Sequence, residues 1–249
     1  MGFLLDMKTQ RGSKAKRIYD SIEDYDGDVL GSLADSSYYN LTKKIFPNSK
    51  IIQYTNFYDI FAELLLDSNE GCILEKPIVD YFVNRYPEDI TYYEDIFDDN
   101  NYGFGFQKNE EGYALLKEFN EFLNNTDIDT LYYKWTHSNN TRNLEIDTNL
   151  NTSSEKIINV AINMDFIPLC FYDINDPRGY EYELVYLFAK KYNYQVNFTR
   201  LENDSQRISY LTEGKANITG GHFTITDERK NIFIFLNQFL DFNYFYSKN

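Results

Sequence analysis

Short apolar runs alternate with helical segments along most of the chain. In the first half, the apolar runs at 28–33, 51–54 and 72–75 are each followed by a helical pattern. The helix after the second run begins at Asn56, a residue type that caps helices. A strand–helix repeat of this kind predicts a mainly parallel sheet covered by helices, with ligand sites at the carboxyl ends of the strands.

The same alternation returns in the second half of the chain. Apolar runs at 157–162 and 194–198 are predicted strands, and the segments that begin at Gly179 and Asp204 are predicted helices. We therefore predict an α/β fold of two lobes, each a mainly parallel sheet flanked by helices. A flexible linker rich in Asn, Thr and Ser is predicted at 136–155, and it is the boundary between the two halves.

Composition excludes several classes of function. The formal net charge is −15, and no basic stripe is present to bind nucleic acid. No apolar run has the length of a membrane span, and residues 1–10 lack the core of a signal peptide. The two cysteines and two histidines are isolated in sequence, so we expect two buried thiols rather than a disulfide framework, and neither a metal site nor a cofactor.

The segment Thr224–Lys230 has the residue types of an anion-binding turn. It follows a strand and a glycine pair, its threonines offer hydroxyl groups, and Arg229 carries a planar fork of donors that matches a carboxylate. An ordinary turn followed by a helix start explains the same residues, with Thr226 as the cap. The residues alone leave both interpretations open.

Two positions in the first half are further candidates. Asp35, Ser36 and Ser37 follow a strand and begin a helix, which is either an anion-binding helix start or a plain cap. Glu75 ends a strand, where it is either a ligand contact or a surface carboxylate.

Four landmarks of the second half occur in a recognisable order. They are the loop Phe166–Pro168, the signature Gly179–Leu184, the segment Gly221–Arg229 and the aromatic run 239–244. From Ile157 to Tyr246 the chain resembles the first lobe of the bacterial extracellular solute-binding proteins of family 3, which bind polar amino acids. Tyr182 and Phe188 depart from the small aliphatic residues usual in the signature helix, which indicates a divergent core.

The first half resembles the second lobe of the same family, so the order of the lobes is inverted. The resemblance implies lobe two at 10–98, a return strand with two helices at 99–135 that packs on lobe one, and lobe one at 156–249. Residues 2–8 resemble the strand that normally follows Tyr246, and so continue from the end of lobe one. Two explanations are open: the chain is cut from a tandem array of modules, or it is a cyclic permutant.

The resemblance implies roles for residues in each lobe. In lobe one, Arg229 would grip a ligand carboxylate with the Thr224 hydroxyl and the main-chain N–H groups of His222 and Thr224. Phe166 would cover the aliphatic part of the ligand. Asn163 stands where some members have an amino-binding carboxylate, and His222 stands where a small residue is usual.

In lobe two, Ser36 and Ser37 would add hydrogen-bond donors, and Glu75 would bind the ligand ammonium group in place of the usual aspartate. Asp35 stands where glycine is usual, which affects selectivity.

The resemblance implies extracytoplasmic binding of a small polar solute, an amino acid, by closure of two lobes, with delivery to the permease of an ABC transporter and no enzymatic activity. A sensory domain of a membrane receptor is one alternative, and an enzyme on the same fold is another, such as a cyclohexadienyl dehydratase-like protein or a lytic transglycosylase-associated module. For an enzyme, Glu75 and Asp165 are the candidate acid and base, and neither has an evident activating partner in the sequence.

Overall fold

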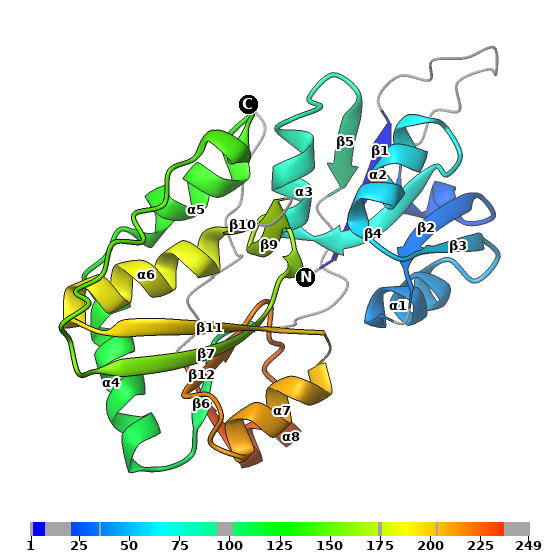
Figure 1. The fold of residues 1–249 in the computed structure, drawn as a ribbon. Coiled ribbons are helices and arrows are strands. Elements are labelled where there is room, and N and C mark those ends of the chain that lie inside the picture. Colours follow the sequence, from blue (N-terminus) through cyan, green and yellow to red (C-terminus); the bar gives the residue numbers. More distant parts are fainter. Residues whose placement is uncertain are drawn as a thin grey trace. The chain divides into compact units, whose positions relative to one another are not determined.

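The structure is a computed structural model that describes residues 2–7, 21–34, 36–93, 102–173, 176–202 and 204–236. The chain divides into two compact units, residues 1–99 and residues 100–249 (Figure 1).

The first unit is built on a five-stranded mixed sheet with the strand order β3-β2-β4-β1-β5. Strand β2 pairs in parallel with β3 and β4, whereas β1 runs antiparallel to both β4 and β5. Four strands therefore share one direction and β1 opposes them. The elements of this unit are β1 (Gly2–Met7), η1 (Ile22–Tyr25), β2 (Val29–Leu33), α1 (Ser37–Ile45), β3 (Lys50–Tyr54), α2 (Phe57–Leu65), β4 (Gly71–Glu75), α3 (Lys76–Val83) and β5 (Ile90–Tyr93).

Apolar side chains from successive strands and helices form the core of the first unit. One cluster joins Tyr25, Leu30, Phe46 and Ile73, each at most 1% exposed. Strand β4 is buried along its whole length, as expected for a central strand covered on both faces.

The second unit repeats this sheet topology. Its main sheet has the order β11-β7-β12-β6-β13, in which β7 pairs in parallel with β11 and β12, and β6 runs antiparallel to β12 and β13. Both units are therefore mixed α/β structures with mainly parallel sheets, as the sequence predicted. The elements are β6 (Gly105–Gln107), α4 (Glu110–Asn124), α5 (Ile128–His137), η2 (Thr141–Asn143), β7 (Ile157–Asn163), β8 (Asp165–Phe166), β9 (Cys170–Asp173), β10 (Asp176–Arg178), α6 (Tyr180–Tyr192), β11 (Gln195–Leu201), α7 (Asp204–Thr212), β12 (Ile218–Gly220), α8 (Asp227–Ile232) and β13 (Phe233–Phe235).

The helices of the second unit cover both faces of its main sheet. The chain steps from β7 to β11 through α6, and then back past β7 to β12 through α7. Because parallel crossovers are right-handed, two steps in opposite directions place their helices on opposite faces. Figure 1 shows α6 on one side of β7 and β11, and α7 on the other.

The segment between α5 and β7, residues 138–156, is named the strap. The sequence predicted a flexible linker here, but the strap is hydrogen-bonded along its length within the second unit. Lys134 Nζ donates to the carbonyl of Glu145, Arg178 Nη1 to the carbonyl of Leu144 at 2.7 Å, and Gln195 Nε2 to the carbonyl of Thr152. The strap is therefore an irregular but anchored part of this unit.

Two free cysteines are buried in different units, Cys72 in β4 and Cys170 in β9. Burial raises the pKa of each thiol well above its ordinary value. We expect both thiols to resist a thiol-specific disulfide reagent at about pH 8 in the folded protein and to react in denaturant, because the reactive thiolate is suppressed only in the folded state. Fast reaction of either thiol in the folded protein would contradict this.

The raised thiol pKa values also set the sign of a pH effect on stability. The thiols do not lower the free energy of unfolding at pH values below the pKa of an unfolded thiol, about 8.5. Above that pH the free energy of unfolding falls progressively, because the thiols ionise more readily in the unfolded chain.

Candidate binding site

In the second unit, strands β7 and β12 end side by side at the point where the strand order reverses. Residue Gly220 at the end of β12 is in register with Ile162 near the end of β7. In α/β sheets, ligands bind at the carboxyl ends of the strands at such a point. Asn163 is the last residue of β7, and Phe166, His222, Thr224 and Arg229 lie in the segments that follow these two strand ends.

Gly221 packs directly against the end of β7. Its φ is +79°, and a Cβ atom built on it would lie 2.1 Å from the carbonyl oxygen of Asn163. Only glycine fits this position. The side-chain Oδ1 of Asn163 is buried and has no hydrogen-bond partner among the described residues. Asn163 therefore presents an unsatisfied acceptor beside this glycine.

Two buried charged residues hold the main chain of Gly221 and His222. Both N–H groups donate to the carboxylate of Glu181 in α6, the one from His222 at 3.0 Å. Arg207 in α7 donates to the carbonyl oxygens of the same two residues, at 2.6 Å and 3.4 Å. The His222 N–H, which the resemblance assigned to a ligand carboxylate, thus donates to Glu181 in this structure.

The rings of Tyr102, His222 and Phe166 form a column. The His222 imidazole stacks on Tyr102 with a centroid distance of 3.7 Å and on Phe166 with a centroid distance of 4.0 Å. Tyr102 and His222 are buried, whereas Phe166 is partly exposed. Three segments distant in sequence therefore meet at this edge of the sheet.

Arg229 is held by its own loop. Its Nη1 donates to the carbonyl of Thr224 at 2.8 Å, and its guanidinium lies 4.4 Å from the ring centroid of Phe223. This bond involves one of the five N–H donors of the side chain and orients the planar fork. A guanidinium held in this way is suited to bidentate binding of a carboxylate.

Thr226 is the cap of the short helix α8, since its hydroxyl accepts the N–H of Arg229 at 3.2 Å. The capping interpretation of this residue is therefore correct. The cap involves only the main-chain N–H of Arg229, so capping does not account for the role of the Arg229 side chain.

The signature Gly179–Leu184 explains how this site is supported. Gly179, with φ +122°, lets the chain pass close to Leu169, where a Cβ atom would lie 2.4 Å from the carbonyl oxygen. Glu181 then reaches the loop after β12, and Glu183 accepts hydrogen bonds from Lys134 and from the indole of Trp135. Tyr182 packs against the ring of Phe198 at 4.6 Å, consistent with a divergent core.

In the first unit, the predicted residues follow the ends of β2 and β4, which pair in parallel. Ser36 is the N-cap residue of α1, yet its hydroxyl donates to the carbonyl of Leu33 at 2.6 Å and does not cap the helix. Ser37 is the first residue of α1. Asp35 lies outside the described residues.

Glu75 ends β4 and is the N-cap residue of α3, with 6% of its surface exposed. It is therefore a buried carboxylate rather than the surface residue of the alternative interpretation. The first unit thus brings Ser36, Ser37 and Glu75 to one edge of its sheet.

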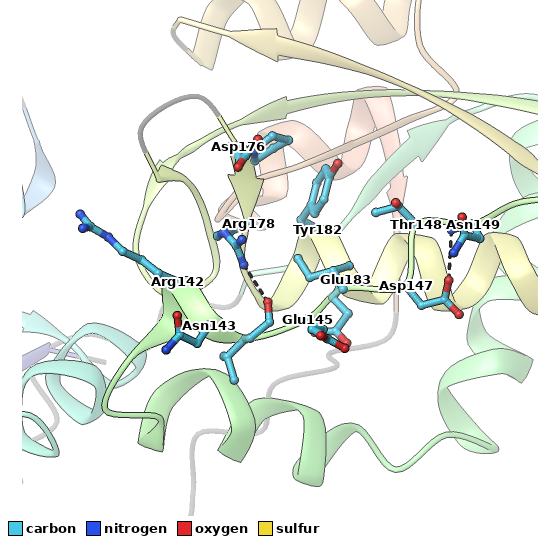
Figure 2. A pocket seen from close by; sticks show the side chains of 13 residues that line it. Arg142, Asn143, Glu145, Asp147, Thr148, Asn149, Asp176, Arg178, Tyr182 and Glu183 are labelled. Atoms are coloured by element: carbon cyan, nitrogen blue, oxygen red, sulfur yellow. Dashed lines mark hydrogen bonds between the residues drawn. The ribbon is translucent and has the colours of Figure 1, made fainter.

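The strap borders a hollow of about 880 Å³ that lies apart from these residues. Figure 2 shows side chains of the strap facing β10 and the start of α6, with Arg178 bonded to the Leu144 carbonyl. None of the predicted site residues lines this hollow. Its lining residues are Arg142, Asn143, Leu144, Glu145, Ile146, Asp147, Thr148, Asn149, Asp176, Pro177, Arg178, Tyr182 and Glu183.

Sequence reasoning missed three residues of the candidate site. Tyr102 was predicted only as part of a strand, and Glu181 only as part of a family signature. Arg207 carried no signal, because a single arginine in a polar helix does not reveal that it is buried with 1% exposure. The position of Glu181, one of two acidic residues after Gly179, was the signal that could have indicated a structural carboxylate.

Residues 158–248 match the family model of bacterial extracellular solute-binding proteins, family 3. This match confirms the resemblance inferred from the sequence for residues 157–246, and the matching family is one of binding proteins. No curated protein matches the chain.

Several solved structures are similar to part of the chain. An ancestral arginine-binding protein bound to arginine has 19% identity over 39% of this chain and 42% of its own, with a TM-score of 0.33. A substrate-binding protein of an amino acid ABC transporter from Streptococcus pneumoniae, bound to L-arginine, has 19% identity over 37% of each chain, with a TM-score of 0.32. The periplasmic VFT2 domain of BvgS from Bordetella pertussis has 12% identity over 37% of this chain and 39% of its own, with a TM-score of 0.32. The similar segment spans about two fifths of the length of these structures.

Two features are absent from the described residues. No helix among them combines the length and apolar character needed to span a membrane. The described part of the chain also has no group of three or more His, Cys, Asp or Glu side chains that could hold a metal ion.

Proposed function

We propose that the protein binds a small polar solute, an amino acid, outside the cytoplasm and delivers it to an ABC transporter without converting it chemically. The carboxylate of the solute binds Arg229 and the Thr224 hydroxyl, and its aliphatic part packs against Phe166. Asn163 accepts a hydrogen bond from the solute through its buried Oδ1. His222 contributes its side chain rather than its main-chain N–H.

One observation carries this proposal. The stretch that matches the family of solute-binding proteins contains the ends of β7 and β12, and these ends bring Asn163, the aromatic column and the Arg229 loop to one edge of a parallel sheet. That edge is where α/β sheets bind ligands. A buried unsatisfied acceptor and a held guanidinium at the same edge suit a ligand that has both an ammonium and a carboxylate group.

The first unit supplies the second half of the proposed site. Glu75 binds the ammonium group, and Ser36, Ser37 and Asp35 contribute polar contacts when the two lobes close. The buried carboxylate of Glu75 at a strand end supports this role.

The two lobes belong to one module whose parts follow each other in permuted order. Their matching sheet topologies support this arrangement, since each main sheet has an antiparallel strand, β1 or β6, between its third and fourth codirectional strands. The strap joins α5 to β7 and is hydrogen-bonded to Arg178 and Gln195 of the second unit. This supports the assignment of α4 and α5 to the second unit.

A thermal-shift screen of the chain against the twenty common L-amino acids tests the proposed function. A bound amino acid at a hundred times its dissociation constant adds about 2.7 kcal/mol to the free energy of unfolding, which raises the melting temperature measurably. We expect a response to one or a few polar amino acids. Equal melting temperatures with all twenty would contradict amino-acid binding.

A further inference from the structure

His222 has a backbone conformation that is unusual for a residue with a side chain. Its φ is +62°, in the left-handed region that favours glycine. Such conformations persist where the surrounding structure holds them, and they concentrate at functional sites. We therefore expect His222 to be held by its surroundings and to have a functional role.

The Glu181–Arg207 clamp holds His222 in this conformation. Glu181 accepts both N–H groups of the Gly221–His222 pair, and Arg207 donates to both carbonyl groups. Both clamp residues are buried, with 3% and 1% exposure, and they come from α6 and α7. Because all four main-chain polar groups are engaged, the pair cannot relax without breaking buried hydrogen bonds.

The clamped main chain places the His222 imidazole between the rings of Tyr102 and Phe166. The planes of His222 and Phe166 differ by 18°, and those of His222 and Tyr102 by 25°, so all three rings are nearly parallel. His222 thus lies on the ring of Phe166, and Tyr102 limits its movement on the other side. The main chain around Tyr102 also pairs with this loop. Tyr102 and Thr224 form an isolated antiparallel β-bridge, and the Gly103 N–H donates to the Phe223 carbonyl.

We propose that His222 is a positioning residue: it fixes the plane of the Phe166 ring and thereby sets the affinity of the site. The second part of this statement rests on the proposed function, and the first part does not. Phe166 is the partly exposed member of the column, so a bound solute would contact the ring of Phe166 rather than the other two rings.

The first test needs no ligand. A single 4-fluorophenylalanine at position 166 reports the surroundings of that ring by fluorine NMR. In His222→Gly, which removes the ring and suits a positive φ, we expect the fluorine signal to move by more than its line width. In His222→Phe, which restores a ring, we expect most of that change to be reversed. The other histidine of the chain is the control, because His137 stacks on Tyr133 in α5 and His137→Ala should leave the signal in place.

The second test uses the twenty L-amino acids and the same three variants. For each amino acid that the unmodified protein binds, His222→Gly should weaken binding about three- to tenfold, which is the range expected for loss of one aromatic pair. His222→Phe should restore most of the affinity, and His137→Ala should not change it. The fluorescence of the buried Trp135 verifies folding of the second unit in every variant.

The outcomes separate the two proposals. An unchanged fluorine signal in His222→Gly would overturn the positioning role, whether or not an amino acid binds. A moved signal with unchanged affinity would overturn the link between ring position and binding. If no amino acid binds the unmodified protein, the proposed function fails, and with it the affinity claim, while the fluorine signal still decides the positioning claim.

Discussion

Arg229→Ala should abolish measurable amino-acid binding and leave the fold intact. Removing one partner of a charge pair in a closed site costs about 2–5 kcal/mol, because the other partner is left unpaired. The expected loss of affinity is therefore at least about thirtyfold. The fold should persist, since Arg229 is only partly buried, and its hydrogen bond to the Thr224 carbonyl and its contact with the Phe223 ring both lie within one loop. Calorimetric titration of the variant with each amino acid that the unmodified protein binds measures this effect.

Two matched variants sharpen the interpretation. Arg229→Lys keeps the charge but removes the planar fork, so it should bind more weakly than the unmodified protein and more tightly than Arg229→Ala. Arg142 is an exposed arginine on the hollow beside the strap, and Arg142→Ala should leave affinity unchanged. Unchanged affinity in Arg229→Ala would contradict the proposal that Arg229 binds the carboxylate of the solute.

Glu181→Ala should destabilise the second unit strongly. The substitution leaves the N–H groups of Gly221 and His222 buried without their acceptor, and each such donor costs about 1–3 kcal/mol. We expect the free energy of unfolding to fall by about 3 kcal/mol. Trp135, the single tryptophan of the chain, is fully buried in the second unit and reports its unfolding in guanidinium through fluorescence.

An exposed acidic residue in the same unit provides the control. Glu213 pairs with Lys215 at the surface, so Glu213→Ala should change the free energy of unfolding by less than about 0.5 kcal/mol. An equally small change in Glu181→Ala would show that the clamp does not stabilise the loop after β12.

The elements with a strong local pattern were predicted from the sequence. Strand β7 and helices α4 and α6 have long apolar runs or helical periodicity, and Asn56 caps α2 as expected, accepting the N–H of Asp59 at 2.9 Å. In contrast, the three-stranded sheet β8–β10 was not predicted from the sequence. Its strands have two to four residues, too few to show an alternation.

The candidate site was predictable only where it is local. Thr224 and Arg229 are five residues apart and meet as their segment suggested. The clamp joins residues 40 and 14 positions apart, and the sequence does not indicate such pairings. The left-handed conformation of His222 was also hidden, because it depends on that clamp and not on the residue type.

Binding of an amino acid is the central claim, and calorimetric titration of the chain with the polar L-amino acids tests it most directly. The account predicts saturable binding of at least one of them with one site per chain, and loss of that binding in Arg229→Ala. Absence of saturable heat for every polar amino acid, or equal binding by the Arg229→Ala variant, would contradict it.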